Sequence, residues 1–367
     1  MNLAKEALLA GANKDSGDYL FKSPSQIKPE EKSLISKYNK VLDKLQSIGP
    51  LNIPNLQEFL EKSKVDFKHL YNDRTISDLK VDNFKIVRKL GSGAFGKVVL
   101  AELKKDDQLY AIKVIDKKAV IKGRHFRYVN NEKRILQSIN FPFCIYLRYF
   151  FVDYNYLYFV MPFVPGGDFF DYLAEFKPLK EDHAKFYVTQ LVLALEYLHY
   201  LELIHRDLKP ENIMMDAFGY IKLADFGQCL RVDGRDRAWT LTGTPEYMAP
   251  EIINRQGYDC AVDWWALGVT LYEICAGRRP FKHSNTDKLY KMILEMKFDL
   301  PPTFSKPLTS LVKLLITSSP EKRLGNYSKG AREVKAHNWF KGTDWHAVLN
   351  RTLPAPYVPS LQKTKKG

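Results

Sequence analysis

The chain has 367 residues, of which 45% are hydrophobic and 13% aromatic, so it can form a sizeable core and wholesale disorder is excluded. Its 56 lysines and arginines outnumber its 42 acidic residues, and the net charge of +14 favours phosphate-bearing or acidic partners without indicating a fold. The four cysteines have neither the density of a disulfide scaffold nor the C-x-x-C spacing of a zinc site, so free thiols are expected.

The N-terminal part of the sequence predicts a tail and two helices. Residues 1–25 are polar and charged and have no apolar segment typical of a signal peptide, so a mobile tail is expected. Apolar residues then recur at helical spacing from Pro29 until Gly49, and a second helix is predicted at 55–71. Neither helix carries obvious chemistry, so both are expected to dock on the core of the chain or on a partner.

Strand signals begin at Phe84 and continue through three segments, the third of which covers 109–115. A basic helical stretch follows. The long apolar segment 141–164 is interrupted by Arg148 and Asp153 and is rich in aromatic residues, so it predicts two buried strands and no membrane span. We therefore expect a soluble protein located in the cytoplasm, or also in the nucleus.

After the two glycines at 166–167 the pattern changes to long helices, such as the one predicted at 181–200. Strands first and helices later predict an α+β fold with two lobes, a small one built on a β-sheet and a large, mostly helical one. The joint between them is expected at 161–167. The last stretch, from Leu353, is rich in proline and predicts an extended strap.

A glycine-rich turn separates the first two predicted strands and reads G-x-G-x-x-G-x-V: Gly91, Ser92, Gly93, Ala94, Phe95, Gly96 and Val98. Glycines let the backbone approach phosphate oxygens and donate N–H groups to them. A dinucleotide-binding fold uses the same letters, but there the glycines open a helix, whereas here a strand follows. The turn is therefore predicted to cover nucleotide phosphates.

Lys113 lies on the third predicted strand within an apolar run, where a lysine is costly to bury unless it meets an opposite charge. A surface lysine on an edge strand is the plainer alternative. Glu132 in the following helix is the natural partner, and such a pair would position the α- and β-phosphates of a nucleotide.

The segment from His205 to Asn212 is the most specific in the sequence, because it places several functional groups in one short loop. Asp207 can accept the proton of an attacking hydroxyl, Lys209 can stabilise a transferring phosphoryl group, and Asn212 can hold a metal ion. Asp225, in a following Asp-Phe-Gly sequence, supplies a carboxylate for the same metal, and this sparse ligand set suits Mg²⁺.

Together these motifs resemble the protein kinase superfamily from about Phe84 to Phe340. The finer resemblance is to the AGC group, and within it to the family of cAMP-dependent protein kinase catalytic subunits, through four segments: 56–71, 239–247, 322–326 and 337–340. The resemblance implies a bilobal kinase fold that transfers the γ-phosphate of ATP to serine or threonine with Mg²⁺. It divides the chain into an N-terminal extension, a helix with its linker, the kinase domain and a C-terminal strap: 1–54, 55–83, 84–340 and 341–367.

The remaining site residues are assigned by this resemblance. The residues around adenine would be Leu90, Val98, Ala111, Met161, Pro162, Phe163, Val164 and Met214. The carboxylates that bind substrate arginines two and three residues before the acceptor would be Asp168, Glu211 and Glu273. The apolar pocket for the residue after the acceptor would use Leu241, Pro245 and Met248, and Arg323 would pair with Glu251.

The resemblance also places an activation-loop phosphosite at Thr240, with Arg206 as its partner. The lysine and histidine that complete the phosphate pocket in the family correspond here to Leu230 and Tyr128. We therefore expect phosphorylation to activate by a smaller factor than a full pocket would give. The missing positive charge would have to come from three arginines: Arg231, Arg235 and Arg237.

The sequence departs from the family at four points. Asp168 and Pro162 each replace a glutamate, which shortens one arginine-binding side chain and removes a hinge donor. Asn2 excludes the N-myristoylation of the family. No phenylalanine follows Phe340, so the acidic tail that borders the ATP site and its Phe-x-x-Phe end are expected to be absent.

The expected partners are protein substrates with basic motifs and a regulatory subunit that carries an Arg-Arg pseudosubstrate, for which Trp239 would be an aromatic platform. A pseudokinase scaffold would predict damage to Lys113, Asp207 or Asp225, and all three are intact. A nucleic-acid-binding module has no zinc, helix-turn-helix or RNA-recognition signature to support it. A cyclic-nucleotide-independent or cGMP-type AGC kinase stays open, although no β-rich nucleotide-sensing pattern precedes the kinase segment.

Overall fold

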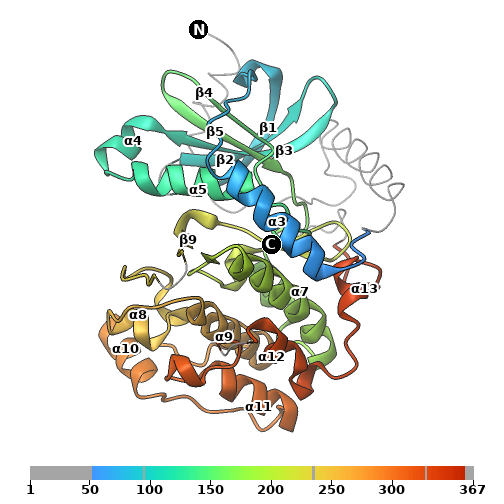
Figure 1. Ribbon diagram of the computed structural model, residues 1–367, viewed down its shortest axis with the longest axis vertical. Coiled ribbons are helices and arrows are strands. Elements are labelled where there is room, and N and C mark those ends of the chain that lie inside the picture. Colours follow the sequence, from blue (N-terminus) through green and yellow to red (C-terminus); the bar gives the residue numbers. More distant parts are fainter. Residues whose placement is uncertain (1–51, 94–95, 234–235, 327–328, 360–367) are drawn as a thin grey trace.

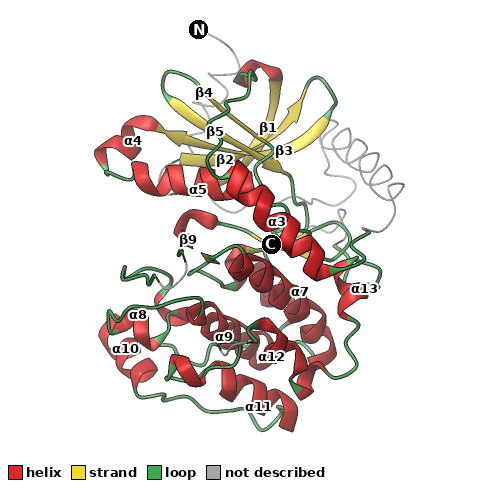
Figure 2. Cartoon of the chain, viewed as in Figure 1, coloured by secondary structure: helices red, strands yellow, loops and turns green. Residues whose placement is uncertain are grey.

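The computed structural model describes residues 52–93, 96–233, 236–326 and 329–359, and the structural statements below concern these residues. They form two lobes, a smaller one that contains a β-sheet and a larger one that is mostly helical (Figures 1 and 2). The predicted α+β, two-lobed architecture is therefore confirmed. The helix predicted between Pro29 and Gly49 lies outside the described residues. No helix of the described ranges is long and apolar enough to cross a membrane.

The small lobe is built on an antiparallel sheet with the strand order β1-β2-β3-β5-β4. Its strands are β1 (Phe84–Gly93), β2 (Gly96–Leu103), β3 (Gln108–Asp116), β4 (Tyr149–Val152) and β5 (Tyr156–Pro162). Aromatic rings fill one face, where Phe151 stacks on Phe84 at 5.8 Å and on Tyr158 at 4.5 Å between ring centroids. The apolar segment 141–164 thus contains the two predicted strands, β4 and β5.

Two helices complete the small lobe, α4 (Lys117–Lys122) and α5 (Phe126–Ser138). Asp116 begins α4 by accepting hydrogen bonds from the backbone N–H groups of Lys118 and Ala119. One face of α5 is buried and carries Val129, Glu132, Ile135 and Leu136. This packing turns Glu132 toward the cleft between the lobes.

The predicted helix at 55–71 is present as α3 (Leu56–Leu70), which begins at the N-cap Asn55. It lies across the two lobes and packs against α5 and the long helix α7 (Glu181–Tyr200) (Figure 1). Lys64 of α3 pairs with Glu202 at 3.0 Å, and the guanidinium of Arg231 lies 5.7 Å from the Phe67 ring centre. The helix therefore docks on the core of its own chain.

The large lobe is built around α7 and α9 (Ala261–Ala276), which are buried along most of their length. Around them lie α6 (Phe169–Phe176), α8 (Pro250–Ile253), α10 (Thr286–Leu294), α11 (Lys306–Leu315), α12 (Ala331–Ala336) and α13 (Trp345–Leu349). Two short strand pairs face the small lobe: β6 (Leu203–Ile204) with β9 (Leu230–Arg231), and β7 (Ile213–Met215) with β8 (Ile221–Leu223).

The C-terminal segment is helical before it becomes extended, because α13 precedes the predicted strap. From Leu353 to the last described residue the chain has no regular structure and lies on the large lobe. The Tyr357 ring packs on Tyr172 at 4.9 Å, and Tyr220 donates its hydroxyl hydrogen to the Leu353 carbonyl. Gly219 allows this approach, since a Cβ there would lie 2.0 Å from the Tyr357 carbonyl oxygen.

Candidate active site

The Lys113 side chain on β3 reaches the Glu132 carboxylate on α5, with 2.6 Å between Nζ and Oε1. Burial by itself lowers the pKa of Lys113, but the charges of Glu132 and Asp225 outweigh it and hold that pKa above its ordinary value. The lysine is therefore fully charged at neutral pH. The Lys113 ammonium group, held in place by Glu132, can bind phosphate oxygens.

The glycine-rich turn joins β1 and β2, and its two central residues, Ala94 and Phe95, lie outside the described residues. A Cβ at Gly96 would lie 1.8 Å from the Val114 carbonyl oxygen, so the fold itself requires this glycine. Cβ atoms at Gly91 and Gly93 would meet no atom of the described residues within 4 Å. Packing among those residues therefore does not require these two glycines, and glycines there leave the backbone open to a phosphate.

The residues expected around adenine lie on both sides of the junction between the lobes. In the sheet, Ala111 of β3 pairs with Met161 of β5. In the large lobe, Met214 of β7 forms a β-bridge with Asp168, which ties the floor of this region to the start of α6. The other members lie on β1, on β2, at the end of β5 or in the connection that follows it: Leu90, Val98, Pro162, Phe163 and Val164. These elements bring most of the predicted set to the junction between the lobes.

The catalytic loop holds the Asp207 carboxylate with several donors. Its Oδ1 accepts from the Thr244 backbone N–H at 3.0 Å and hydroxyl at 2.7 Å, and its Oδ2 accepts from Lys209 at 3.0 Å and Asn212 at 2.9 Å. Burial by itself raises the pKa of Asp207, but the Thr244 hydrogen bond and the Lys209 charge outweigh it and keep that pKa below its ordinary value. The carboxylate is therefore ionised and fixed in one orientation.

A buried carboxylate on α9, Asp263, anchors the same loop from below. It accepts the backbone N–H groups of His205 and Arg206, both at 2.9 Å, and contacts His199 Nε2 at 2.8 Å. Burial by itself raises the pKa of Asp263, and these contacts outweigh it, so the pKa lies below its ordinary value. Sequence reasoning did not single out Asp263, although an acidic residue inside the apolar run of α9 was a usable signal.

The two residues expected to hold a metal, Asn212 and Asp225, lie at the edge of this loop. The Asn212 amide nitrogen donates to the Asp207 carboxylate, so its carbonyl oxygen is the atom that can face a cation. Asp225 is exposed and left-handed, with φ 55°, while Phe226 beside it is fully buried. Among the described residues no group of three or more His, Cys, Asp and Glu gathers as a metal site. The Asn212 and Asp225 oxygens form a sparse ligand pair, and Mg²⁺ takes few protein ligands and completes its shell with phosphates and water.

The three predicted arginine-binding carboxylates have different surroundings. Asp168 caps α6 by accepting the Asp171 backbone N–H at 2.8 Å. Glu211 is exposed, and Glu273 is buried on α9, where it accepts the hydroxyl of Tyr247. Glu273 has a second partner that the sequence reasoning missed, Arg279, at 3.5 Å. The charge of Glu211 also acts on Arg279.

The residues expected to receive the side chain after the acceptor lie together near the end of the activation segment. Leu241 is exposed, Pro245 is half-buried and Met248 is buried against the hydroxyl of Tyr290. Trp239 next to them is 66% exposed. This is an apolar surface that a protein partner can cover.

Thr240 lies where the resemblance predicts a phosphosite, and its hydroxyl oxygen accepts from Arg206 Nη1 at 2.8 Å. Tyr258 donates its hydroxyl hydrogen to the Thr240 carbonyl at 2.8 Å. Tyr128 is exposed and Leu230 pairs with Ile204 in the β6-β9 ladder. Arg231 pairs with Glu202 and Asp233. Arg237 contacts Asp259 and donates to the Gly257 carbonyl. Arg235 lies outside the described residues.

Arg323 and Glu251 form the bridge expected from the resemblance, with contacts of 2.6 and 3.0 Å between two nitrogens and two oxygens. Arg323 is 0% exposed and also donates to the carbonyls of Thr317 and Ala261.

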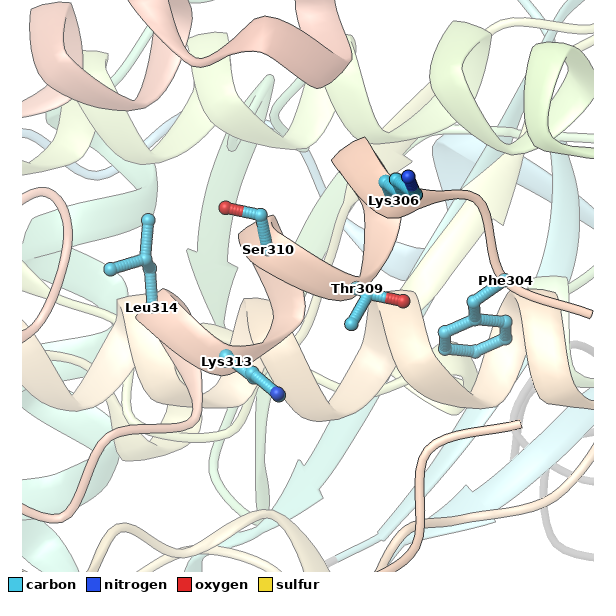
Figure 3. Close-up of a pocket in the computed structure, with 6 residues that line it drawn as sticks. All are labelled: Phe304, Lys306, Thr309, Ser310, Lys313 and Leu314. Carbon is cyan, nitrogen blue, oxygen red and sulfur yellow. The ribbon is translucent and has the colours of Figure 1, made fainter. Parts of the chain in front are cut away.

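A separate surface pocket lies on α11 and shares no residue with the predicted site (Figure 3). It is lined by Phe304, Lys306, Thr309, Ser310, Lys313 and Leu314.

Comparisons with known proteins agree with this geometry. The family model described as protein kinase domain matches residues 84–340. Catalytic subunit 2 of cAMP-dependent protein kinase from Drosophila melanogaster is 42% identical over 305 residues, which are 82% of this chain and 86% of that protein. The cAMP-dependent protein kinase catalytic subunit PRKX from Mus musculus is 42% identical over 77% of this chain and 79% of its own. The type 3 enzyme from Saccharomyces cerevisiae is 40% identical over 80% of this chain and 73% of its own.

A family match over most of the described chain and relatives at this level of identity agree with the two lobes, the charged Lys113–Glu132 pair and the fixed Asp207. The chain belongs to the protein kinase family, as a serine/threonine kinase of the AGC group, a family that uses ATP and Mg²⁺.

Proposed function

We propose that this chain transfers the γ-phosphate of ATP to serine or threonine in proteins that carry arginine before the acceptor, as the catalytic partner of a cyclic-nucleotide-binding regulatory subunit. The observation that carries the proposal is the fixed, ionised Asp207, which contacts Lys209 and Thr244. Relatives that are named catalytic subunits of cAMP-dependent protein kinase support the same assignment.

The residues of the chain divide the reaction between them. Asp207 accepts the proton of the acceptor hydroxyl, whose oxygen forms the new bond to the γ-phosphorus while the bond from that phosphorus to the departing ADP oxygen breaks. Lys209 compensates the charge of the transferring group, and Lys113, oriented by Glu132, holds the nucleotide phosphates. Asn212 and Asp225 would hold Mg²⁺, which when bound neutralises phosphate charge.

Recognition of substrate would use the carboxylates and the apolar surface on either side of Asp207. Charge-assisted contacts between arginine and carboxylates contribute about 1.5–3 kcal/mol each when well formed. Asp168 and Glu211 would bind an arginine three residues before the acceptor, and Glu211 with Glu273 an arginine two before. Leu241, Pro245 and Met248 would receive an apolar residue after the acceptor.

The test is phosphorylation of a peptide array by the purified chain with ATP and Mg²⁺, in which arginine is scanned through the positions before serine. We expect basic peptides to be phosphorylated most efficiently. A preference for acidic or proline-directed peptides would refute the proposed substrate class.

The regulatory partner has its own test. Trp239 is exposed beside Leu241, so we expect the chain to form a complex with a regulatory subunit and to leave it when cAMP is added. Size-exclusion chromatography with and without cAMP measures this. Trp239→Ala should weaken the complex, whereas Tyr154→Ala, which removes a 91% exposed aromatic ring from the small lobe, should not. A free monomer under all conditions would contradict the regulatory assignment.

A further inference from the structure

Arg279 of the chain itself contacts Glu273, one of the carboxylates proposed to bind a substrate arginine. After α9 ends, Gly277 turns the chain with φ 72°, and Arg279 folds back onto the helix. Its Nη1 lies 2.6 Å from Glu246 Oε1, and its Nε lies 3.5 Å from Glu273 Oε1. Its guanidinium also lies 5.7 Å from the ring centre of Tyr247.

These contacts leave Glu273 with a partner on each oxygen. The Tyr247 hydroxyl donates to Oε2, and Arg279 holds Oε1. Glu273 is 3% exposed, so a substrate arginine could approach it only by sharing or displacing one of these partners. A bidentate arginine contact needs both oxygens.

The charges around Arg279 also indicate that Glu273 is partly neutralised before a substrate binds. Two carboxylates contact Arg279, those of Glu246 and Glu273, and the charge of Glu211 also acts on it. Burial by itself lowers the pKa of Arg279, but Tyr247 and these glutamates outweigh it, so the guanidinium stays charged. One of the three negative charges is therefore already compensated before any substrate binds.

The Arg279 contact can be exchanged, unlike the other arginine–glutamate bridge of the large lobe. Arg323 is 0% exposed and makes two short contacts to Glu251. The Arg279 side chain is 22% exposed, and its contact to Glu273 is long. A substrate arginine that enters would replace one arginine by another, and such an exchange gives little net binding free energy because one charged contact is lost for each that is formed.

We propose that Arg279 sets the preference of this enzyme two residues before the acceptor, by serving as an internal counter-ion of Glu273 and Glu246. The enzyme then accepts a neutral residue at that position nearly as well as arginine. This inference rests on the proposed function, because it needs Glu273 to face the peptide. Selection for basic substrates falls mainly to the position three residues before the acceptor.

The experiment compares two serine peptides that differ only two residues before the acceptor, where one has arginine and the other alanine. Both carry arginine three before and leucine after the acceptor. For the wild-type chain we expect the ratio of kcat/KM between the peptides to be below about fivefold. In Arg279→Met, which keeps an apolar stem over Tyr247 but removes the charge, the ratio should rise about tenfold through KM, since one charge-assisted contact becomes open to the substrate.

Arg278→Met is the matched control, because the exposed guanidinium of Arg278 lies over Tyr272 on α9, away from these contacts. Its peptide ratio should equal that of the wild type. Arg279→Lys keeps the charge and should stay below the Arg279→Met ratio.

The outcomes separate this inference from the proposed function. Phosphorylation of both peptides with an unchanged ratio in Arg279→Met overturns the role of Arg279 alone. A wild-type ratio above about fiftyfold overturns it without any variant, as it would mean that a full arginine pocket is open. Absence of phosphorylation of either peptide by the wild type overturns the proposed substrate class, and this inference with it.

Discussion

Asp207 in the catalytic loop and the more exposed carboxylates of Glu211 and Glu246 are held in opposite ways. In the loop, Asp207 is buried and has partners on both of its oxygens from Thr244, Lys209 and Asn212. Among the carboxylates, Glu211 and Glu246 are partly or fully exposed, and the partner of Glu246 is the movable side chain of Arg279.

The difference shows where this enzyme can vary without losing its chemistry. Buried groups with several partners are costly to rearrange, because removing one partner leaves the others unsatisfied. Half-exposed ion pairs contribute little stability and can be exchanged for contacts to a substrate. Substitutions in the loop are therefore expected to change turnover or stability, and substitutions among the carboxylates to change peptide preference.

The largest effect is expected at the centre of the loop. Asp207→Asn removes the proton acceptor while keeping a side chain of similar size, so kcat should fall by about 10²–10⁴-fold and nucleotide binding should remain. Steady-state kinetics and a fluorescent ATP analogue measure the two quantities. Asp287→Asn on exposed α10 is the control and should retain wild-type turnover. Near-normal turnover of Asp207→Asn would remove Asp207 from its proposed role.

The second largest effect is expected at Asp263, which holds the catalytic loop from α9. Asp263→Asn weakens an anchor that holds two backbone N–H groups and His199, and we expect a loss of about 3 kcal/mol in the free energy of unfolding at pH 7. Because the pKa of Asp263 is lowered by folding, its charge stabilises the fold above the ordinary carboxyl pKa of 3.8. That contribution is lost as pH falls through the lower value of the folded state.

Urea unfolding at several pH values measures this effect. The difference between wild type and Asp263→Asn should be full at neutral pH and should shrink below about pH 4, where the Asp263 carboxylate of the unfolded chain begins to take up its proton. Asp259→Asn, a more exposed acid just before α9, should have a much smaller effect. Equal stability of both variants at pH 7 would contradict the anchoring role.

The activation segment should give a moderate effect. Thr240 already contacts Arg206 and Tyr258 without a phosphate, and Leu230 and Tyr128 supply no cation. Phosphorylation adds about −1.5 to −2 charges, and with one arginine in place we expect activation of about tenfold. Turnover of the phosphorylated protein beside Thr240→Ala measures it.

Leu230→Lys, added to both of these proteins, should raise activation of the phosphorylated form further and leave Thr240→Ala unchanged. If phosphorylated protein and Thr240→Ala turn over equally, Thr240 is no phosphoswitch. If Leu230→Lys brings no gain, the weakened pocket is the wrong explanation.

The smallest effect is expected from Asp168→Glu, which lengthens a carboxylate by one CH₂ toward the substrate. Asp168 now caps α6, and glutamate caps a helix poorly, so stability should fall by about 0.5–1 kcal/mol. Preference for arginine three residues before the acceptor should rise about threefold, in line with a weak, partly exposed contact. Asp171→Glu, in the first turn of the same helix, is the control, and an unchanged preference in Asp168→Glu would show that its reach does not limit binding.

The sequence predicted the two lobes, the strands of the small lobe and helices α3 and α7, because hydrophobic periodicity and turn residues specify such elements locally. The Lys113–Glu132 contact was predicted from the cost of burying an unpaired lysine and the Arg323–Glu251 contact from the family resemblance, and both are present. Helix α13, which precedes the extended strap predicted from Leu353, was not predicted; Asp344 provides its N-cap.

Contacts between distant segments without a motif were not predictable. Asp263 meets the catalytic loop 57 positions earlier in the chain, and Thr244 meets Asp207 from 37 positions later. Only the packing of α9 under the loop brings the first pair together. The contact of Arg279 with Glu273 was not predictable for another reason. The neighbouring Arg278 is equally basic, and sequence alone does not say which of two adjacent arginines turns inward.

The position of α3 has a mechanical consequence. Lys64 pairs with Glu202 in the large lobe, Phe67 and Tyr71 lie against Arg231 of β9, and the Tyr71 hydroxyl donates to Asn131 of α5. The C-terminal half of α3 is thus joined to both lobes, so opening the two lobes must strain contacts on one side of the helix or the other. We therefore expect the amplitude of that opening, and with it the rate of product release, to depend on a helix that contributes no atom to the chemistry.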